Sequence, residues 1–272
     1  MKKPIISKLR RLLPASILLF TRFETKAQYH APDFSDSAYK QELSFKISGS
    51  PSVKNTIRAR SFFIPSMMLA YGITTIKNNG AESLNQEVKE EIWTAHPHSK
   101  RHIDNYLQFA PAVAVYGLNA AGIRGKHGLL DRSMIYLLSN VITNVTVTTL
   151  KHTAHFQRPD GSAYSSFPSG HTAEAFASAE FLRQEYKGVS PWYGIAGYAA
   201  ASATGILRMY NNRHWLGDVV AGAGIGMAST KLAYLVYPAI KRKFFRNRDM
   251  NTFVAPYYQG GSAGVSVVYS FH

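Results

Sequence analysis

Cysteine is absent from all 272 residues of this chain. Its absence excludes disulfide bonds, thiolate metal sites, iron–sulfur clusters and cysteine nucleophiles. Acidic residues are also scarce, with 16 Asp and Glu against 31 Lys and Arg, which gives a formal net charge of +15. Hydrophobic residues make up 46% of the chain and charged residues only 17%. That composition excludes a disordered protein and is sufficient for a sizeable buried core.

The basic excess could serve nucleic acid or another anion. The sequence has no zinc-finger spacing, no basic zipper and no aromatic–basic RNA signature. We therefore predict no nucleic-acid partner. Attraction to anionic phosphate, on a small substrate or on a lipid headgroup, explains the excess equally well.

The first 27 residues are typical of an export signal. They hold seven basic residues and one acidic residue, and they contain the ten-residue apolar run Leu12–Thr21. Such a run has the length of a signal-peptide core and is too short to span a bilayer. We predict a signal peptide over residues 1–27, with an N-terminal anchor or amphipathic helix as the alternative. The polar residues 28–60 are predicted to form a surface segment.

The rest of the chain is predicted to be mostly helical. One helix is expected where Ala173, Phe176, Ala177 and Phe181 recur at helical spacing. Five more are expected in stretches without Asp, Glu, Lys or Arg, the last of which continues past Lys231 to Ile240. These stretches are Ser61–Ile76, Asn105–Ile123, Ser133–Leu150, Gly188–Leu207 and Val219–Thr230. The pattern predicts six helices over residues 61–240, and the polar segment Ala81–Trp93 is a further candidate.

One question about this helical region stays open at the level of sequence, which is whether it lies in a membrane. Four of the uncharged stretches are 16 to 20 residues long, near the roughly 20 that span a bilayer. They are rich in small and polar residues, which suit a membrane bundle, a soluble bundle or one half-sunk in the interface. We favour the membrane-embedded bundle. Residues 241–272 are predicted to form a basic segment and a short C-terminal strand or hairpin.

The first of three motifs contains Lys151 and, seven residues later, Arg158 followed by Pro159. On a continuing helix this offset places both cations on one face. Pro159 disfavours helical geometry at the preceding residue and is expected to end the helix there. Two cations near a helix end suit an anionic group.

The second motif is Pro168-Ser169-Gly170-His171, immediately before a predicted helix. Serine at this place is first of all an N-cap, and glycine permits a close approach of the backbone. The free N–H groups of a helix start bind phosphate oxygens. His171 adds a titratable donor.

The third motif runs from Arg208 through His214 to Asp218. His214 and Asp218 are four residues apart and would share a face of a helix. A carboxylate can hold an imidazole in one tautomer and stabilise its charged form. Together the motifs offer three cations, two histidines and one orienting carboxylate, which suits phosphoryl transfer without a metal.

These motifs resemble those of the type-2 phosphatidic acid phosphatase and vanadium haloperoxidase superfamily. The family pattern is Lys-x6-Arg-Pro, then Pro-Ser-Gly-His, then Ser-Arg-x5-His-x3-Asp. One position departs from it, because Leu207 stands where the family has serine. The resemblance implies an all-α, six-helix bundle of the acid phosphatase/haloperoxidase type, with the site at one end.

The resemblance also implies roles for the motif residues. His214 would attack phosphorus to form a phosphohistidine, and Asp218 would orient it. His171 would protonate the leaving group. Phosphate would be bound by the remaining motif residues, which are Lys151, Arg158, Ser169, Gly170 and Arg208. No metal or other cofactor is implied.

The sequence therefore predicts a metal-independent phosphoric ester hydrolase of the bacterial cell envelope, exported and either membrane-embedded or periplasmic. Its expected substrates are phosphate or pyrophosphate esters of membrane lipids, such as phosphatidic acid, polyprenyl diphosphate or a lipid A type phosphate. A soluble periplasmic acid phosphatase of broad specificity is the alternative. A vanadate-dependent haloperoxidase and a non-enzymatic phospholipid-binding protein are further alternatives.

Overall fold

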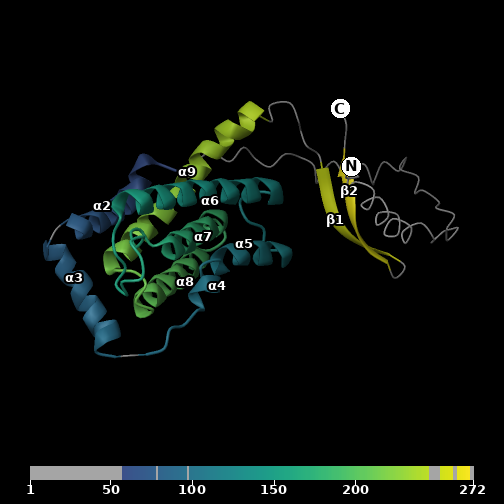
Figure 1. Cartoon of the computed structure of the whole chain (residues 1–272). Helices are drawn as coiled ribbons and strands as arrows, with labels where there is room; N and C mark the ends of the chain where they lie inside the picture. Colours follow the sequence, from purple (N-terminus) through teal and green to yellow (C-terminus); the bar gives the residue numbers. More distant parts are fainter. Residues whose placement is uncertain (1–56, 78, 97, 245–251, 260–261, 270–272) are drawn as a thin grey trace, which may run out of the picture. The chain divides into compact units, whose positions relative to one another are not determined.

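A computed structural model describes residues 57–77, 79–96, 98–244, 252–259 and 262–269 (Figure 1). The predicted signal peptide, most of the segment 28–60 and part of the basic C-terminal segment lie outside the described residues. Within the described residues every regular element is helical, apart from two strands near the C-terminus. The predicted all-α class is confirmed.

Eight α-helices and two shorter helical turns are present in the described part of the chain. The turns are the 3-10 helix η2 (Ala59–Phe62) and the π-helical η3 (Glu90–Thr94). The α-helices are α2 (Phe63–Lys77), α3 (Asn79–Lys89), α4 (Asp104–Leu107), α5 (Ala110–Ala120), α6 (Leu129–Ala154), α7 (Gly170–Tyr186), α8 (Pro191–Tyr210) and α9 (Leu216–Phe244).

The helix count exceeds the predicted six for two reasons. The polar candidate Ala81–Trp93 is indeed helical and falls within α3 and η3. The uncharged stretch 105–123 is divided into α4 and α5, which meet around Phe109. Pro111 stands in the first turn of α5, where its missing N–H is tolerated, and it cannot continue a helix from α4.

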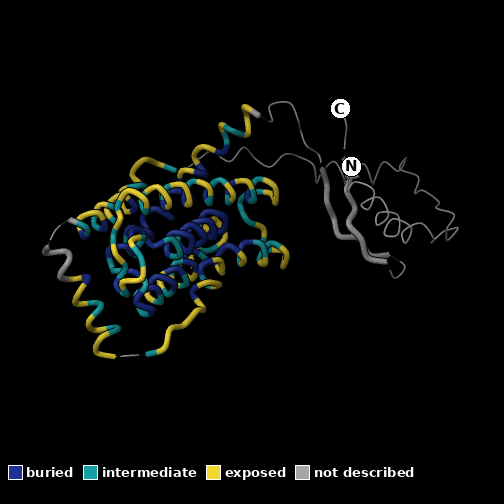
Figure 2. The backbone as a smooth tube through the Cα atoms, in the orientation of Figure 1, coloured by how far each residue is buried: buried dark blue, intermediate teal, exposed yellow. Residues whose placement is uncertain are grey.

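Helix α7 is the central element of the helical region. Thirteen of its seventeen residues are buried. It packs against α8 and α9, with α5 and α6 also in contact. Figure 2 shows its tube in the colour of buried residues, surrounded by helices with exposed faces. The N-terminus of α7, which carries the second motif, is therefore held by neighbours on several sides.

Two glycines let α9 approach α7 closely. A Cβ atom on Gly222 would lie 2.5 Å from the Ser169 carbonyl oxygen, and one on Gly226 would lie 2.1 Å from that of Ala173. Both distances are far below van der Waals contact, so no larger residue fits at this spacing. The close approach brings the second and third motifs together, because the Ser169 N–H donates to the Asp218 carbonyl oxygen at 3.0 Å.

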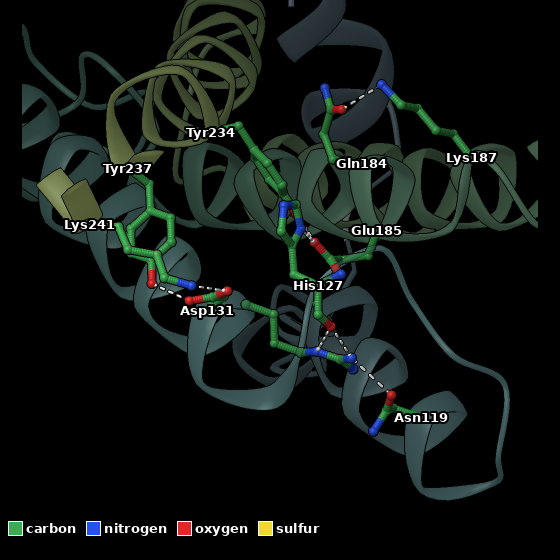
Figure 3. Close-up of polar contacts among 10 residues, drawn as sticks. Asn119, His127, Asp131, Gln184, Glu185, Lys187, Tyr234, Tyr237 and Lys241 are labelled. Carbon is green, nitrogen blue, oxygen red and sulfur yellow. Dashed lines mark hydrogen bonds and ion pairs between the residues drawn. The ribbon is translucent and has the colours of Figure 1, made fainter. Parts of the chain in front are cut away.

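A polar cluster fastens the other end of α7 (Figure 3). The carboxylate of Glu185 accepts hydrogen bonds from the backbone N–H of His127 (3.0 Å), from its Nδ1 (2.7 Å) and from the hydroxyl of Tyr234 (2.6 Å). Asp131 accepts from Tyr237 (2.6 Å) and Lys241 (2.8 Å). These bonds connect the loop before α6 to α7, and the start of α6 to α9.

The C-terminal strands are β1 (Thr252–Gln259) and β2 (Ser262–Tyr269). They pair antiparallel, with Thr252 opposite Tyr269 and Gln259 opposite Ser262. The sequence predicted a short strand or hairpin in this part of the chain.

Candidate active site

The first motif lies at the end of α6 and in the loop that follows. Lys151 is in the last turn of α6, and the helix ends at Ala154. His155 adopts a left-handed backbone with φ of 48°, and its ring stacks on that of Tyr164 at 5.5 Å between centroids. Arg158 therefore lies in the loop, and the expectation that it shares a helix face with Lys151 is wrong.

The loop nevertheless returns Arg158 to the end of α6. Its turn is closed by hydrogen bonds from Arg158 N to the Ala163 oxygen (2.9 Å) and from Gly161 N to the Arg158 oxygen (3.0 Å). Lys151 donates from Nζ to the Ser165 carbonyl oxygen at 2.6 Å, and Arg158 Nη2 lies 3.5 Å from the Ser165 hydroxyl. Both cations thus contact the same residue.

The second motif forms the start of α7 as the sequence predicts. Ser169 is the N-cap, and its Oγ accepts from the backbone N–H of Thr172 at 3.5 Å and lies 2.8 Å from the Thr172 hydroxyl. Gly170 is the first helical residue. His171 donates from Nε2 to the Oδ1 of Asn105 in α4 at 2.9 Å, a partner that no motif indicated.

The third motif lies at the junction of α8 and α9. Because α8 ends at Tyr210 and α9 begins at Leu216, His214 lies in the connecting loop and not on a helix with Asp218. The expected proximity remains, with His214 Nδ1 3.4 Å from Asp218 Oδ2. That oxygen accepts hydrogen bonds from the hydroxyl of Ser166 (2.5 Å) and from the N–H of Trp215 (2.9 Å). The Nδ1 of His214 faces the carboxylate, so its Nε2 points away from it.

Arg208 has a buried acidic partner that the motifs did not include. Its Nη1 lies 2.5 Å from Oδ2 of Asp104, whose side chain is 1% exposed. Sequence reasoning missed Asp104 although a signal existed. It is the only acidic residue between Glu91 and Asp131, and it stands at the start of an apolar stretch. An isolated charge in such a place needs a buried partner.

A cavity of about 310 Å³ joins parts of all three motifs at the N-terminal end of α7. Its lining residues are Lys100, His102, Asn105, Arg158, His171, Arg208, Asn211 and Arg213. Lys151, His214 and Asp218 do not line it. His214 and Asp218 are buried, at 4% and 0% exposure. The cavity is thus lined by cations and by the imidazoles of His102 and His171, whereas the His214–Asp218 pair lies in the protein interior.

Burial governs the titration of both motif histidines. It lowers the pKa of His214 to about 4, and the nearby charge of Asp218 offsets only part of this effect. Burial, followed by the positive charge of Arg208, lowers the pKa of His171 to about 4. Both imidazoles are therefore neutral at pH 7 in this structure. A neutral ring is the form in which a histidine nitrogen can act as a nucleophile.

The fold and the site define an all-α protein with a cationic, histidine-bearing cavity suited to a phosphate group. Residues 132–242 match the model of the PAP2 superfamily. This range holds all three motifs, and the resemblance to the type-2 phosphatidic acid phosphatase superfamily is confirmed.

One curated relative is the lipid A 1-phosphatase of Porphyromonas gingivalis. It is 33% identical over 191 residues, which cover 70% of this chain and 40% of that protein. The chain thus spans about two fifths of the length of the curated relative it matches.

Two solved structures are also similar. The crystal structure of Aquifex aeolicus LpxE has a TM-score of 0.43 and 22% identity, over 55% of this chain and 94% of the other. The transmembrane PAP2 type phosphatidylglycerolphosphate phosphatase of Bacillus subtilis has a TM-score of 0.45 and 20% identity, over 68% and 100%.

Proposed function

We propose that this protein is a metal-independent phosphoric ester hydrolase that acts on phosphate or pyrophosphate esters of membrane lipids. The observation that carries the proposal is the convergence of Arg158, Arg208 and His171 on one cavity, with the His214–Asp218 pair buried close by. Phosphoryl transfer needs charge neutralisation, a nucleophile and a proton for the leaving oxygen, and these residue types supply all three. The phosphatase domain would comprise residues 61–240.

In the proposed mechanism, Lys151, Arg158 and Arg208 neutralise the phosphate oxygens. Ser169 and the backbone of Gly170 complete the phosphate site at the start of α7. The Nε2 of His214 attacks phosphorus, and the bond between phosphorus and the ester oxygen breaks. A phosphohistidine forms. The leaving group is an alcohol when the substrate is a monophosphate ester, and a monophosphate ester when the substrate is a diphosphate ester.

The negative charge of a bound phosphate group raises the pKa of His171 again, so that the ring is protonated in the complex. His171 then donates the proton that the leaving oxygen requires, and later takes one from the water that attacks the phosphohistidine. This second step releases inorganic phosphate and restores His214. Because a buried carboxylate favours the charged ring, Asp218 stabilises His214 as positive charge develops on it.

The lipid substrate and the membrane location are supported by an exposed apolar face. Helices α6 and α9 are long and apolar enough to cross a bilayer. On α6 a row of large apolar side chains faces outward, consisting of Leu130, Met134, Leu137, Val141 and Val145. Contact between this apolar row and water is unfavourable, whereas contact with the acyl chains of lipids is not. On this basis, and on the signal-like composition of residues 1–27, we place the protein in the bacterial cell envelope.

The name of the curated relative favours one lipid class among those that the chemistry permits. That protein is a lipid A 1-phosphatase, and a similar phosphorylated lipid is a candidate substrate here.

The test is a His214→Asn variant, assayed for phosphate release from a panel of lipid and soluble phosphate esters. We expect turnover to fall by at least about 10³-fold, because the proposed covalent intermediate forms on the Nε2 of His214. Circular dichroism would check that the variant is folded. Turnover near that of the wild type in a folded variant contradicts the proposed mechanism.

A further inference from the structure

The cavity has more positive charge than one phosphate group requires. Arg158 and Arg208 already line it as parts of the proposed phosphate site. Two further cations, Lys100 and Arg213, line the same cavity, and no carboxylate is among its lining residues. The proposed site for one phosphate group therefore leaves these two side chains without an assigned role.

The two additional cations share one carboxylate. Asp160 Oδ2 lies 3.3 Å from Arg213 Nη1 and 3.6 Å from Lys100 Nζ. One negative charge cannot neutralise two positive charges, so an excess of one remains at this part of the cavity. The side chains of Lys100 and Arg213 are 36% and 34% exposed, which leaves both accessible to a ligand.

The backbone that carries Lys100 is fixed to the third motif. Asn211 accepts a hydrogen bond from Arg101 N at 2.8 Å and donates one to the Arg101 oxygen at 2.6 Å. His98 Nε2 lies 2.8 Å from the Tyr210 oxygen, and the two rings stack at 3.5 Å between centroids. These contacts, far apart in sequence, hold Lys100 at the cavity before any ligand arrives.

The size of the cavity permits a second anionic group. Water occupies about 30 Å³ per molecule in the liquid. A cavity of about 310 Å³ therefore has the volume of about ten waters, whereas a phosphate group has five heavy atoms. One phosphate group would leave much of it for another part of the substrate.

We propose that Lys100 and Arg213 form a second anion subsite that binds a second phosphate of the same substrate. The inference rests on the proposed function. It predicts that the preferred lipid substrates carry two phosphates, as diphosphates or bisphosphates, and that monophosphates are poorer substrates. Asp160 Oδ2 pairs with both cations and so holds them near each other.

The experiment compares three esters with the same alkyl chain, which are dodecyl monophosphate, dodecyl diphosphate and 1,2-dodecanediol bisphosphate. Wild type is compared with a Lys100→Gln/Arg213→Gln double variant and with each single variant. Arg124→Gln is the matched control, because it removes one charge from an exposed residue of the loop before α6, away from the cavity lining.

We expect wild type to prefer an ester with two phosphates. In the double variant, the ratio of kcat/KM for that ester to kcat/KM for the monophosphate should fall at least about tenfold, since bonds to charged groups are among the stronger ones. The Arg124→Gln control should keep the wild-type ratio. Preference for the diphosphate or for the bisphosphate shows whether the two phosphates must be directly linked. An unchanged ratio in the double variant overturns the proposal.

A binding measurement separates this inference from the proposed function. Calorimetry would give the affinities for methylenediphosphonate, which resists hydrolysis, and for inorganic phosphate. The double variant should lose affinity mainly for the diphosphonate. If no ester is hydrolysed but this selective loss is observed, the subsite stands and the proposed function fails. Equal affinities in wild type and variant contradict the subsite.

Discussion

The protonation state of His214 depends on two opposing effects, which are its burial and the charge of a neighbouring carboxylate. His214 is 4% exposed, and its partner Asp218 is fully buried. Burial of an imidazole favours the neutral ring, whereas the adjacent carboxylate favours the charged ring. Burial is the larger effect here, because the pKa of His214 is lowered to about 4. The ring therefore enters the proposed reaction neutral and gains a stabilising partner once it carries charge.

This lowered pKa predicts a pH dependence of stability. The unfolded chain protonates His214 near pH 6.5, and the folded chain does so only near pH 4. The unfolded state thus binds more protons between these values, and stability falls as the pH decreases through this window. From pH 7 to pH 5 we expect His214 to contribute a loss of about 2 kcal/mol in the free energy of unfolding.

Urea unfolding at several pH values would measure this loss in wild type and in His214→Asn. Both proteins retain His171, so the difference between their pH profiles isolates His214. Asparagine does not titrate, and the variant should show the shallower profile. Parallel profiles would contradict a lowered pKa for His214.

The effect of a substitution at His171 is expected to depend on the leaving group of the substrate. General acid catalysis contributes about 10²- to 10⁴-fold and matters most when the leaving oxygen is a strong base. His171→Asn should therefore reduce turnover of an alkyl phosphate far more than turnover of a nitrophenyl phosphate. Steady-state kinetics on both substrates is the measurement. Equal losses would argue against His171 as the acid.

At the scale of elements, the site depends on how closely α9 packs against α7. Gly226 is the tightest point, because a Cβ there would lie 2.1 Å from the Ala173 carbonyl oxygen. Gly226→Ala should push the two helices apart and destabilise the protein by about 1–3 kcal/mol, as overpacking does. It should also reduce activity, since the hydrogen bond between Ser169 and Asp218 spans the same interface.

Gly117→Ala is the matched control for this prediction. Gly117 is also in a helix, and a Cβ there would have no neighbour within 4 Å. This change should be neutral or stabilise by about 0.5–1 kcal/mol, because alanine is the better helix former. Thermal unfolding of both variants would measure the effect. Similar effects of the two substitutions would show that close packing against α7 is not the reason why a larger residue is unfavourable at position 226.

At the scale of the whole molecule, the balance of buried and exposed apolar surface suggests a lipid environment. The candidate window of α6 is only 22% buried, and that of α9 is 72% buried. A buried apolar helix occurs in many soluble proteins, so α9 alone is weak evidence for a membrane location. The exposed apolar face of α6 is the stronger argument, because water would contact it in a soluble protein.

Fractionation without detergent tests this interpretation. We expect the full chain, expressed in a bacterium, to sediment with membranes and to remain there after a carbonate wash. A peripheral protein held by its positive charge would be released under these conditions. Recovery of active protein in the clear supernatant would favour the soluble periplasmic phosphatase instead.

The sequence by itself determined the class of the fold and the residue types of the proposed site. The three motifs give the residue types and their order. Uncharged stretches and helical spacing give most helix positions, because burial of whole helices leaves a pattern in composition. Even the N-cap role of Ser169 follows from local rules, because it depends only on neighbours within one helical turn.

Only the tertiary structure decided which side chains meet. Lys151 and Arg158 contact the same residue through a loop that no periodicity describes, since the left-handed backbone of His155 ends α6 early. Asp104 and Asn105 approach the motif residues from a segment more than 60 positions away, and the sequence carries no spacing rule for such contacts. The cavity and its additional cations likewise exist only because distant segments pack together, which local sequence preferences do not encode.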